Sequence, residues 1–303
     1  MTEKRTLVIG WFTFEWMGAT AGDYIAADIL CGWLREAGIA YDLAVFKPVE
    51  KGQIATESIV PTDYRAVVFV CGPIGDAPPL SDFLGRFPHA QKFAINVSLL
   101  QERSEWNPFV HVVERDSRQR TCPDLTFAAA PAAAPVVGII YLDHQPEYSG
   151  VMHEEVERVV REVLARRDIA TVQIDTQLDP ANRHGLRTPA QVESVIAKMD
   201  AVITTRLHGA ALAIRRGVPP VVIDSVRGGA KLTRQMKRIE WPLALEVGTL
   251  DAGAFERALD FALTPGARDL AVQCARRAAR DVGEVKEEFM REFQRARKGE
   301  LKC

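Results

Sequence analysis

The stretch DAVITTRLHGAALAIRRGVPPVVID, residues 200–224, contains the pattern around which the chain is organised. Residues 201–205 are rich in β-branched side chains, which predicts a short buried strand. Residues 209–216 have small and aliphatic side chains at helical spacing, and Gly217 stands where a helix commonly ends in a left-handed glycine. A second strand is expected over residues 218–223. The order strand, helix, strand is typical of a parallel sheet covered by helices.

Four residues, Arg206, Leu207, His208 and Gly209, lie at the junction between the first strand and the helix. In an open parallel sheet, ligands bind beyond the carboxyl ends of the strands. The start of the following helix directs its free amides and its positive dipole end to the same place. Arg206 and His208 therefore indicate an anion site with a titratable neighbour. The alternative is a basic surface turn with a capping histidine.

This junction resembles the signature of the polysaccharide pyruvyl transferases, in which a strand, Arg-Leu-His-Gly, a small-residue helix, Gly-Val-Pro and a strand follow one another. Residues 206–209 and 217–219 carry the match. The resemblance implies a fold of the GT-B type, with two Rossmann-like domains and mostly parallel sheets. It also implies transfer of the enolpyruvyl group of phosphoenolpyruvate onto a sugar or glycan hydroxyl pair as a ketal. The strand-helix rhythm of both halves independently favours an α/β protein.

Composition and charge exclude several other classes. The formal net charge of −2 over 303 residues gives no bulk attraction to nucleic acid or to a membrane surface. No apolar run approaches the ~20 residues that a membrane span needs. The five cysteines are scattered and include no Cys-x-x-Cys pair, so neither zinc nor a disulfide framework is indicated. We expect a cytoplasmic protein without a metal or cofactor, and its oligomeric state stays open.

The sequence AAAPAAAP, residues 128–135, reads as a linker because it has small and prolyl residues without periodicity. We predict an amino-terminal Rossmann-like domain over residues 1–130, on the acceptor side. A carboxyl-terminal Rossmann-like domain is predicted over residues 131–303, on the donor side. Residues 267–297 form a long helical stretch, and in GT-B proteins the last helix commonly crosses back to the first domain.

In the amino-terminal half, Gly22 and Asp23 open a helix expected over residues 24–37. An Asp at this place caps the free amides of the first turn. The family resemblance adds a second interpretation, because relatives carry a similar Gly-Asp, and Asp23 then orients the acceptor or acts as a base. The preceding loop holds aromatic side chains that are either core or a stacking platform for a sugar ring, namely Trp11, Phe12, Phe14 and Trp16.

Two departures from the family pattern concern the acceptor. Relatives have a glycine-rich turn after the apolar strand at residues 64–70, whereas Pro73 interrupts the turn here and removes one N–H donor. Relatives also often carry glycines after the strand at residues 93–97, and this chain does not. A catalytically silent sugar-binding homologue is therefore one alternative. A GT-B glycosyltransferase using a nucleotide sugar is another, although no pair of spaced glutamates for a ribose follows residues 200–224.

Two further basic residues enter through the resemblance. Arg115 begins an Arg-Asp-Ser run that relatives share, and it either pairs with Asp116 or supplies positive charge for the donor. Lys231 stands where relatives often carry a lysine, although its basic neighbours also fit a solvated helix face. The expected donor-binding set is Arg206, Leu207, Gly209, Arg115 and Lys231, with His208 and Asp23 as candidate catalytic residues.

The chemistry of the donor explains these residue types. Phosphoenolpyruvate carries a phosphate and a carboxylate, and the fork of Arg206 suits either group in bidentate geometry. Ketal formation needs a proton on the methylene carbon and a base for the attacking hydroxyl. Histidine is the natural side chain for either task near neutral pH, which is why His208 is assigned to acid–base chemistry. The sequence leaves open which group protonates carbon.

Overall fold

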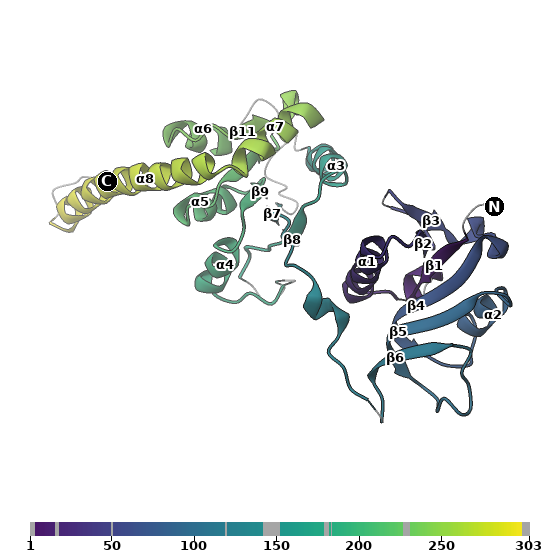
Figure 1. Ribbon diagram of the computed structural model, residues 1–303. Helices are drawn as coiled ribbons and strands as arrows, with labels where there is room; N and C mark the ends of the chain where they lie inside the picture. Colours follow the sequence, from purple (N-terminus) through teal and green to yellow (C-terminus); the bar gives the residue numbers. More distant parts are fainter. Residues whose placement is uncertain are drawn as a thin grey trace. The chain divides into compact units, whose positions relative to one another are not determined.

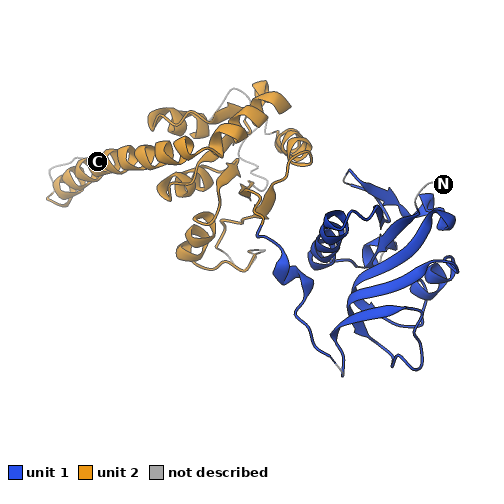
Figure 2. Ribbon diagram, viewed as in Figure 1, with its two compact units in different colours: residues 1–131 blue, residues 132–303 orange. Residues whose placement is uncertain are grey.

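The computed structural model describes residues 4–15, 18–49, 51–118, 120–141, 152–178, 182, 184–226 and 231–298. The chain divides into two compact units, Met1–Pro131 and Ala132–Cys303 (Figure 2). Trp16 of the aromatic loop lies outside the described residues. Among the helices in the described ranges, none combines the length and apolar character needed to cross a membrane.

Unit 1 is built on a six-stranded sheet with the order β3-β2-β1-β4-β5-β6 (Figure 1). Neighbouring strands of this sheet run parallel, and the order is that of a Rossmann sheet. Its elements are β1 (Arg5–Ile9), α1 (Ala21–Glu36), β2 (Tyr41–Val45), β3 (Gln53–Ala55), β4 (Tyr64–Ile74), α2 (Leu80–Gly85), β5 (Gln91–Leu99) and β6 (His111–Asp116), with short 3-10 turns at Trp11–Thr13, Thr56–Ser58, Pro61–Asp63 and Leu125–Ala128.

The two faces of this sheet are covered by different helices because side chains alternate along a strand. Leu7 and Ile9 of β1 belong to the same apolar cluster as Phe83 of α2. Val8 belongs instead to the cluster that contains Ala26 of α1. The aromatic loop after β1 is divided in the same way. Phe12 is buried and stacks on Tyr24, whereas Trp11 is only half-buried.

Strand β4 is longer than the sequence pattern predicts. The expected glycine-containing turn after residue 70 is wrong, because β4 continues through Pro73 to Ile74 and stays paired with β5. Strand β1 has already ended at Ile9, opposite Phe69. On that side the carbonyl of Pro73 accepts a hydrogen bond from Trp11 Nε1 at 3.1 Å. No described strand lies beside Pro73 on the β1 side. The N–H that proline lacks would point to this side, so its absence leaves no strand hydrogen bond unmade.

Unit 2 has a five-stranded parallel sheet with the order β11-β10-β9-β7-β8 (Figure 1). Its elements are β7 (Val136–Ile140), α3 (His153–Leu164), β8 (Ala170–Gln173), α4 (Pro189–Ile196), β9 (Ala201–Thr204), α5 (Leu207–Arg215), β10 (Pro220–Asp224), α6 (Lys231–Arg238), β11 (Ala244–Glu246), α7 (Ala252–Ala262) and α8 (Pro265–Arg297).

The central strands of unit 2 are buried on both faces, which explains their continuous apolar runs. Ile203 packs in the cluster that contains Val160 of α3 and Leu259 of α7. Its neighbour Val202 packs in the cluster that contains Ile196 of α4. Helix α8 contacts α5 and α7 within the unit. That this helix also returns to the first domain stays a prediction.

The α/β class with parallel sheets is confirmed, since the strand pairs of both described sheets run parallel. Each unit has a Rossmann-like sheet of its own, and two such units are the components of a GT-B type fold. Elements that the sequence analysis omitted are short or lie late in a unit, and they include β3, α2, β11 and α7.

Candidate functional site

The candidate site of unit 2 lies where the order of its sheet reverses. The strands β9, β10 and β11 follow one another on one side of β7, whereas β8 lies on the other side. Ligands of open α/β sheets bind at such a switch point, beyond the carboxyl ends of the strands. Arg206 comes two residues after the last residue of β9 and precedes α5. The sequence motif therefore stands at the topological switch point of its own unit.

Helix α5 begins two residues earlier than the sequence pattern predicts. Arg206 is its N-cap with extended backbone, and Leu207, His208 and Gly209 form the first turn. The amide of Ala210 already bonds the carbonyl of Arg206 at 3.1 Å. The first-turn amides that a helix leaves without intrahelical partners thus belong to residues 207–209. At the other end, Gly217 has the predicted left-handed conformation with a φ of 68°.

Gly209 lies inside the first turn because the turn packs directly on the end of β9. A Cβ atom at this position would stand 2.4 Å from Oγ1 of Thr204 and 3.0 Å from Ile140. The Thr204 hydroxyl is fully buried, lies 3.0 Å from the Ile140 carbonyl, and accepts from the amide of Arg206 at 3.0 Å. Thr204 therefore fixes the backbone from which the side chain of Arg206 projects.

We expect Gly209→Ala to destabilise unit 2. The added methyl group meets two fully buried side chains, and overpacking of this kind costs about 1–3 kcal/mol. Urea unfolding of the full chain, followed by a signal from unit 2, measures the loss.

Gly283→Ala is the matched control for this change. Gly283 lies in α8 of the same unit, and its added Cβ meets nothing within 4 Å. This variant should keep or raise the unfolding free energy by up to ~1 kcal/mol, because alanine favours a helix over glycine. Equal stability of Gly209→Ala and Gly283→Ala would contradict the packing argument.

The guanidinium group of Arg206 is held by two other parts of unit 2. Its Nε donates to the carbonyl of Tyr141, just after β7, at 2.9 Å. Its Nη1 donates to Oγ1 of Thr176, just after β8, at 3.2 Å. The carboxyl ends of three strands thus orient one half-buried arginine. Sequence reasoning missed Thr176, because a single threonine in a polar loop gives no signal of this contact.

The other residues of the predicted donor set have different surroundings. His208 is exposed in the first turn of α5, where its imidazole is accessible to solvent. Leu207 is half-buried against the main apolar cluster of unit 2, so only its backbone is suited to an anion. Lys231 is exposed and begins α6. The buried carboxylate of Asp224 ties α6 to the end of β10 by accepting from the amide and hydroxyl of Thr233.

Unit 1 has a pocket at its own switch point, between β1 and β4. The pocket has a volume of about 470 Å³, and Trp11, Asp23 and Gly72 contribute to its lining. Helix α1 begins at Ala21, three residues before the predicted start, so Asp23 lies within the first turn. Its carboxylate accepts from the amide and hydroxyl of Thr20 at 2.7 and 2.8 Å. Asp23 is therefore both a helix-capping residue and a wall of this pocket.

Arg115 belongs to a polar network in unit 1. Its guanidinium group pairs with Asp124 at 2.9 Å and donates to Ser98 at 3.0 Å, whereas Asp116 is more distant at 3.4 Å. The pairing of Arg115 with Asp116 that the sequence suggested is present, and Asp124 makes a second, closer contact. Donor binding by Arg115 stays a prediction.

Two residues of this network have unusual backbone geometry. Cys71 in β4 and Asn96 in β5 have φ values of 65° and 59°, in the left-handed region that is uncommon for residues other than glycine. The Asn96 side chain donates to Asp124 at 3.1 Å. Burial and a hydrogen bond with Asp23 raise the pKa of the Cys71 thiol to about 11. The network thus links Asp23 and Arg115 through Cys71, which sequence reasoning missed.

The acid stability of unit 1 should depend on Asp124. Burial alone would raise its pKa, but hydrogen bonds from Thr126, Arg115 and Asn96 lower it to about 2. A free Asp titrates near ~3.9, so the stabilisation is complete above about pH 4 and is lost as the pH falls toward 2. The difference between these two pKa values corresponds to a stabilisation of unit 1 by roughly 2 kcal/mol.

Asp124→Asn should therefore destabilise unit 1 at pH 7 and show a smaller deficit at pH 3. Urea midpoints at the two pH values test this expectation, with exposed Asp28→Asn as the control. A deficit of equal size at both pH values would show that the charge of Asp124 is not the cause.

The structure thus groups the predicted residues by unit. Arg206, Leu207, His208 and Gly209 stand together at one strand end of unit 2, and Lys231 begins the helix after the adjacent strand. Asp23 and Arg115 belong to unit 1 and share the Cys71 network. The described residues contain no group of three or more His, Cys, Asp or Glu side chains arranged to hold a metal.

Known structures offer only distant similarity. Three solved structures are a glycotransferase of kitacinnamycin (TM-score 0.33, 10% identity, 90% of this chain and 94% of that chain), the glycosyltransferase SnogD from Streptomyces nogalater (0.30, 14%, 90% and 94%) and MurG from Acinetobacter baumannii (0.32, 8%, 90% and 95%). These TM-scores are too low to support an argument. None of the curated proteins compared with the chain matches it.

A comparison with protein families is more specific. Residues 120–225 match the family model of the polysaccharide pyruvyl transferases. The matched range contains the whole of the Arg-Leu-His-Gly junction, the strands β7, β8, β9 and β10, and the contacts of Arg206 with Tyr141 and Thr176. The resemblance found in the sequence is thereby confirmed over residues 120–225, which carry the pattern of a transferase family, the polysaccharide pyruvyl transferases.

Proposed function

We propose that the chain is a pyruvyl transferase that moves the enolpyruvyl group of phosphoenolpyruvate onto two hydroxyls of a sugar or glycan, forming a ketal. The observation that carries the proposal is the position of Arg206. It stands at the switch point of a parallel sheet, at the start of a helix, within the range that matches the family. A donor with an anionic phosphate and an anionic carboxylate suits a fixed guanidinium group beside free helix amides.

The proposed reaction balances without a metal or redox cofactor. One acceptor hydroxyl attacks C2 of phosphoenolpyruvate, and a proton is added to the methylene carbon, which becomes a methyl group. The second hydroxyl then attacks C2 as the C–O bond to phosphate breaks. Of the two hydroxyl protons, one is equivalent to the proton placed on carbon, and the other leaves with inorganic phosphate. His208 is the proposed acid–base group, since its imidazole is exposed in the first turn of α5.

The remaining residues have supporting roles in the proposal. The amides of Leu207 and Gly209 bind donor oxygens, and Lys231 and Arg115 add positive charge. Asp23 orients the acceptor or serves as a base, and the unit 1 pocket that it lines is the proposed acceptor side. The aromatic wall of Trp11 suits a sugar ring in this pocket. A cytoplasmic location and a role in exopolysaccharide biosynthesis belong to the same proposal.

A binding comparison on the full chain tests the donor. Phosphoenolpyruvate should raise the melting temperature and give a saturable calorimetric titration, whereas UDP-sugars should not. With a candidate acceptor, the product should show the methyl resonance of a pyruvate ketal, and inorganic phosphate should be released. Binding of a UDP-sugar alone would favour the nucleotide-sugar glycosyltransferase. Binding of neither donor would favour a catalytically silent sugar-binding protein.

A further inference from the structure

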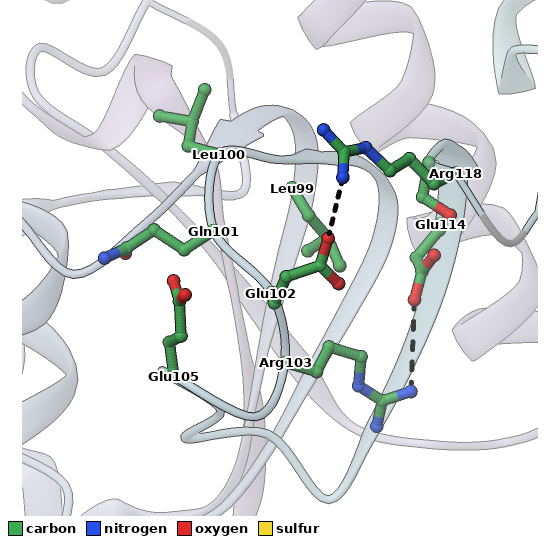
Figure 3. Close-up of a pocket in the computed structure, with 9 residues that line it drawn as sticks. Leu99, Leu100, Gln101, Glu102, Arg103, Glu105, Glu114 and Arg118 are labelled. Carbon is green, nitrogen blue, oxygen red and sulfur yellow. Dashed lines mark ion pairs between the residues drawn. The ribbon is translucent and has the colours of Figure 1, made fainter.

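Unit 1 contains a second pocket, which adjoins the one that Asp23 lines, since Leu100 contributes to both linings. It has a volume of about 320 Å³ and lies beside the carboxyl ends of β5 and β6. Figure 3 shows Glu114 projecting from β6, while Glu102, Arg103 and Glu105 come from the segment that follows β5. The proposed pyruvyl transfer makes no use of this pocket.

Glu114 is the unusual member of the pocket. It lies on the same inward face of β6 as the buried Val112, and only 6% of its surface is exposed. Its ionic partner is Arg103, whose Nη1 stands 3.9 Å from Oε1 (Figure 3). That distance exceeds the reach of a hydrogen bond. Within the described part of the chain, no hydrogen bond to the Glu114 carboxylate is seen. The Glu114 carboxylate lines the pocket, and its pair with Arg103 is longer than a hydrogen bond, so its oxygens can accept from a donor supplied by a ligand.

The charges around Glu114 define which ligand fits. A second ion pair in the pocket joins Arg118 to Glu102, also at 3.9 Å, and Glu105 adds a third carboxylate to the lining. Three carboxylates therefore face two guanidinium groups, which leaves the lining with an excess of one negative charge. A cationic N–H donor is complementary to this arrangement, and a charge-assisted contact to a buried carboxylate is among the stronger hydrogen bonds.

The rest of the lining suits a hydroxylated ring. Leu99 and the 70% exposed Leu100 give an apolar surface, and Gln101 adds a polar side chain. The volume is near the lower end of the range for small-molecule pockets, which fits a single monosaccharide ring. A flat anion such as phosphoenolpyruvate is disfavoured by the three carboxylates.

We propose that this pocket binds an amino sugar, with the protonated amine at Glu114 and the ring against Leu99 and Leu100. The inference goes beyond pyruvyl transfer and does not depend on it. It assigns to unit 1 a second saccharide site, selective for a free amine.

Calorimetric titrations of the full chain with glucosamine, glucose, N-acetylglucosamine and putrescine test the assignment. Glucosamine should bind about tenfold or more tightly than glucose or N-acetylglucosamine, because only its amine is charged and free to donate to Glu114. Putrescine should also bind more weakly, because it has no ring. Equal affinity for glucosamine and glucose would overturn the role of the amine, and equal affinity for putrescine would overturn the role of the ring.

Two variants locate the binding site. Glu114→Gln should weaken glucosamine binding by about tenfold or more, since the charge is lost while the shape is kept. Glu57→Gln is the matched control, because Glu57 is exposed elsewhere in unit 1. An unchanged affinity of Glu114→Gln would place the site elsewhere and overturn the proposal.

Arg103→Ala keeps the test decisive if Glu114→Gln does not fold. The Arg103 side chain is 41% exposed, and its removal frees Glu114 from its only ionic neighbour among the described residues. Glucosamine should then bind more tightly than to the unmodified chain. An unchanged or weakened affinity of Arg103→Ala would contradict the assignment of the amine to Glu114.

Discussion

Replacing His208 by alanine should lower turnover by ~10²–10⁴ while the affinity for phosphoenolpyruvate changes far less, because the proposed role of His208 is proton transfer. The structure makes this variant informative. His208 is exposed in the first turn of α5, so its removal leaves no cavity. The melting temperature should stay close to that of the unmodified chain.

Three measurements on the same His208→Ala protein separate chemistry from folding. These are the melting temperature, donor affinity by calorimetry, and turnover with an acceptor for which a ketal product has been detected. His89→Ala, a change of an exposed histidine in unit 1, is the matched control and should keep full turnover. A stable His208→Ala enzyme with near-normal turnover would remove His208 from the mechanism.

Replacing Arg206 by alanine should weaken phosphoenolpyruvate binding by ~1.5–3 kcal/mol, the scale of a hydrogen bond to a charged group. Arg206→Lys should not restore the affinity. A lysine has one donor group at its tip, whereas the arginine donates to Tyr141 and Thr176 from different nitrogens and keeps a planar fork. Calorimetric titration of both variants with phosphoenolpyruvate measures the effect.

Two controls address the structural contacts of Arg206. Arg215→Ala removes an exposed arginine from the far end of α5, where it pairs with Glu193, and should leave donor affinity unchanged. Thr176→Val removes one contact that orients the guanidinium group but keeps its charge, so it should weaken binding less than Arg206→Ala. Unchanged donor affinity in Arg206→Ala would exclude Arg206 as the donor anchor.

Much of the local structure near the candidate site is predictable because the signals are local. The β-branched run before Arg206 and the helical spacing after it indicate a strand and a helix, and both are present. A threonine followed by proline is a typical helix start, and the Thr188 hydroxyl does accept from the amide of Gln191 at the beginning of α4. The predicted element boundaries were less accurate. Helix α5 begins at Leu207, two residues before the predicted start, because Gly209 lets the first turn pack on Thr204.

Contacts between distant residues were not predictable. Arg115 pairs with the adjacent Asp116, but its closer ion pair is with Asp124, nine residues further along the chain. The expected turn at Pro73 is part of a strand, because β1 has ended and Trp11 lies beside β4 there. Neither fact has a signature in the spacing of residues along the chain.

The sequence by itself determined the α/β class, the parallel character of the sheets and the Arg-Leu-His-Gly junction, because hydrophobic periodicity and glycine placement depend on nearby residues. Only the tertiary structure decided what holds the junction together. Arg206 is oriented by Tyr141 and Thr176, which are 65 and 30 residues away in the chain. The tertiary structure likewise decided that Glu114 is buried beside Arg103. The reason is that the order of strands in a sheet sets which chain segments meet at its carboxyl edge. No local sequence pattern specifies this order.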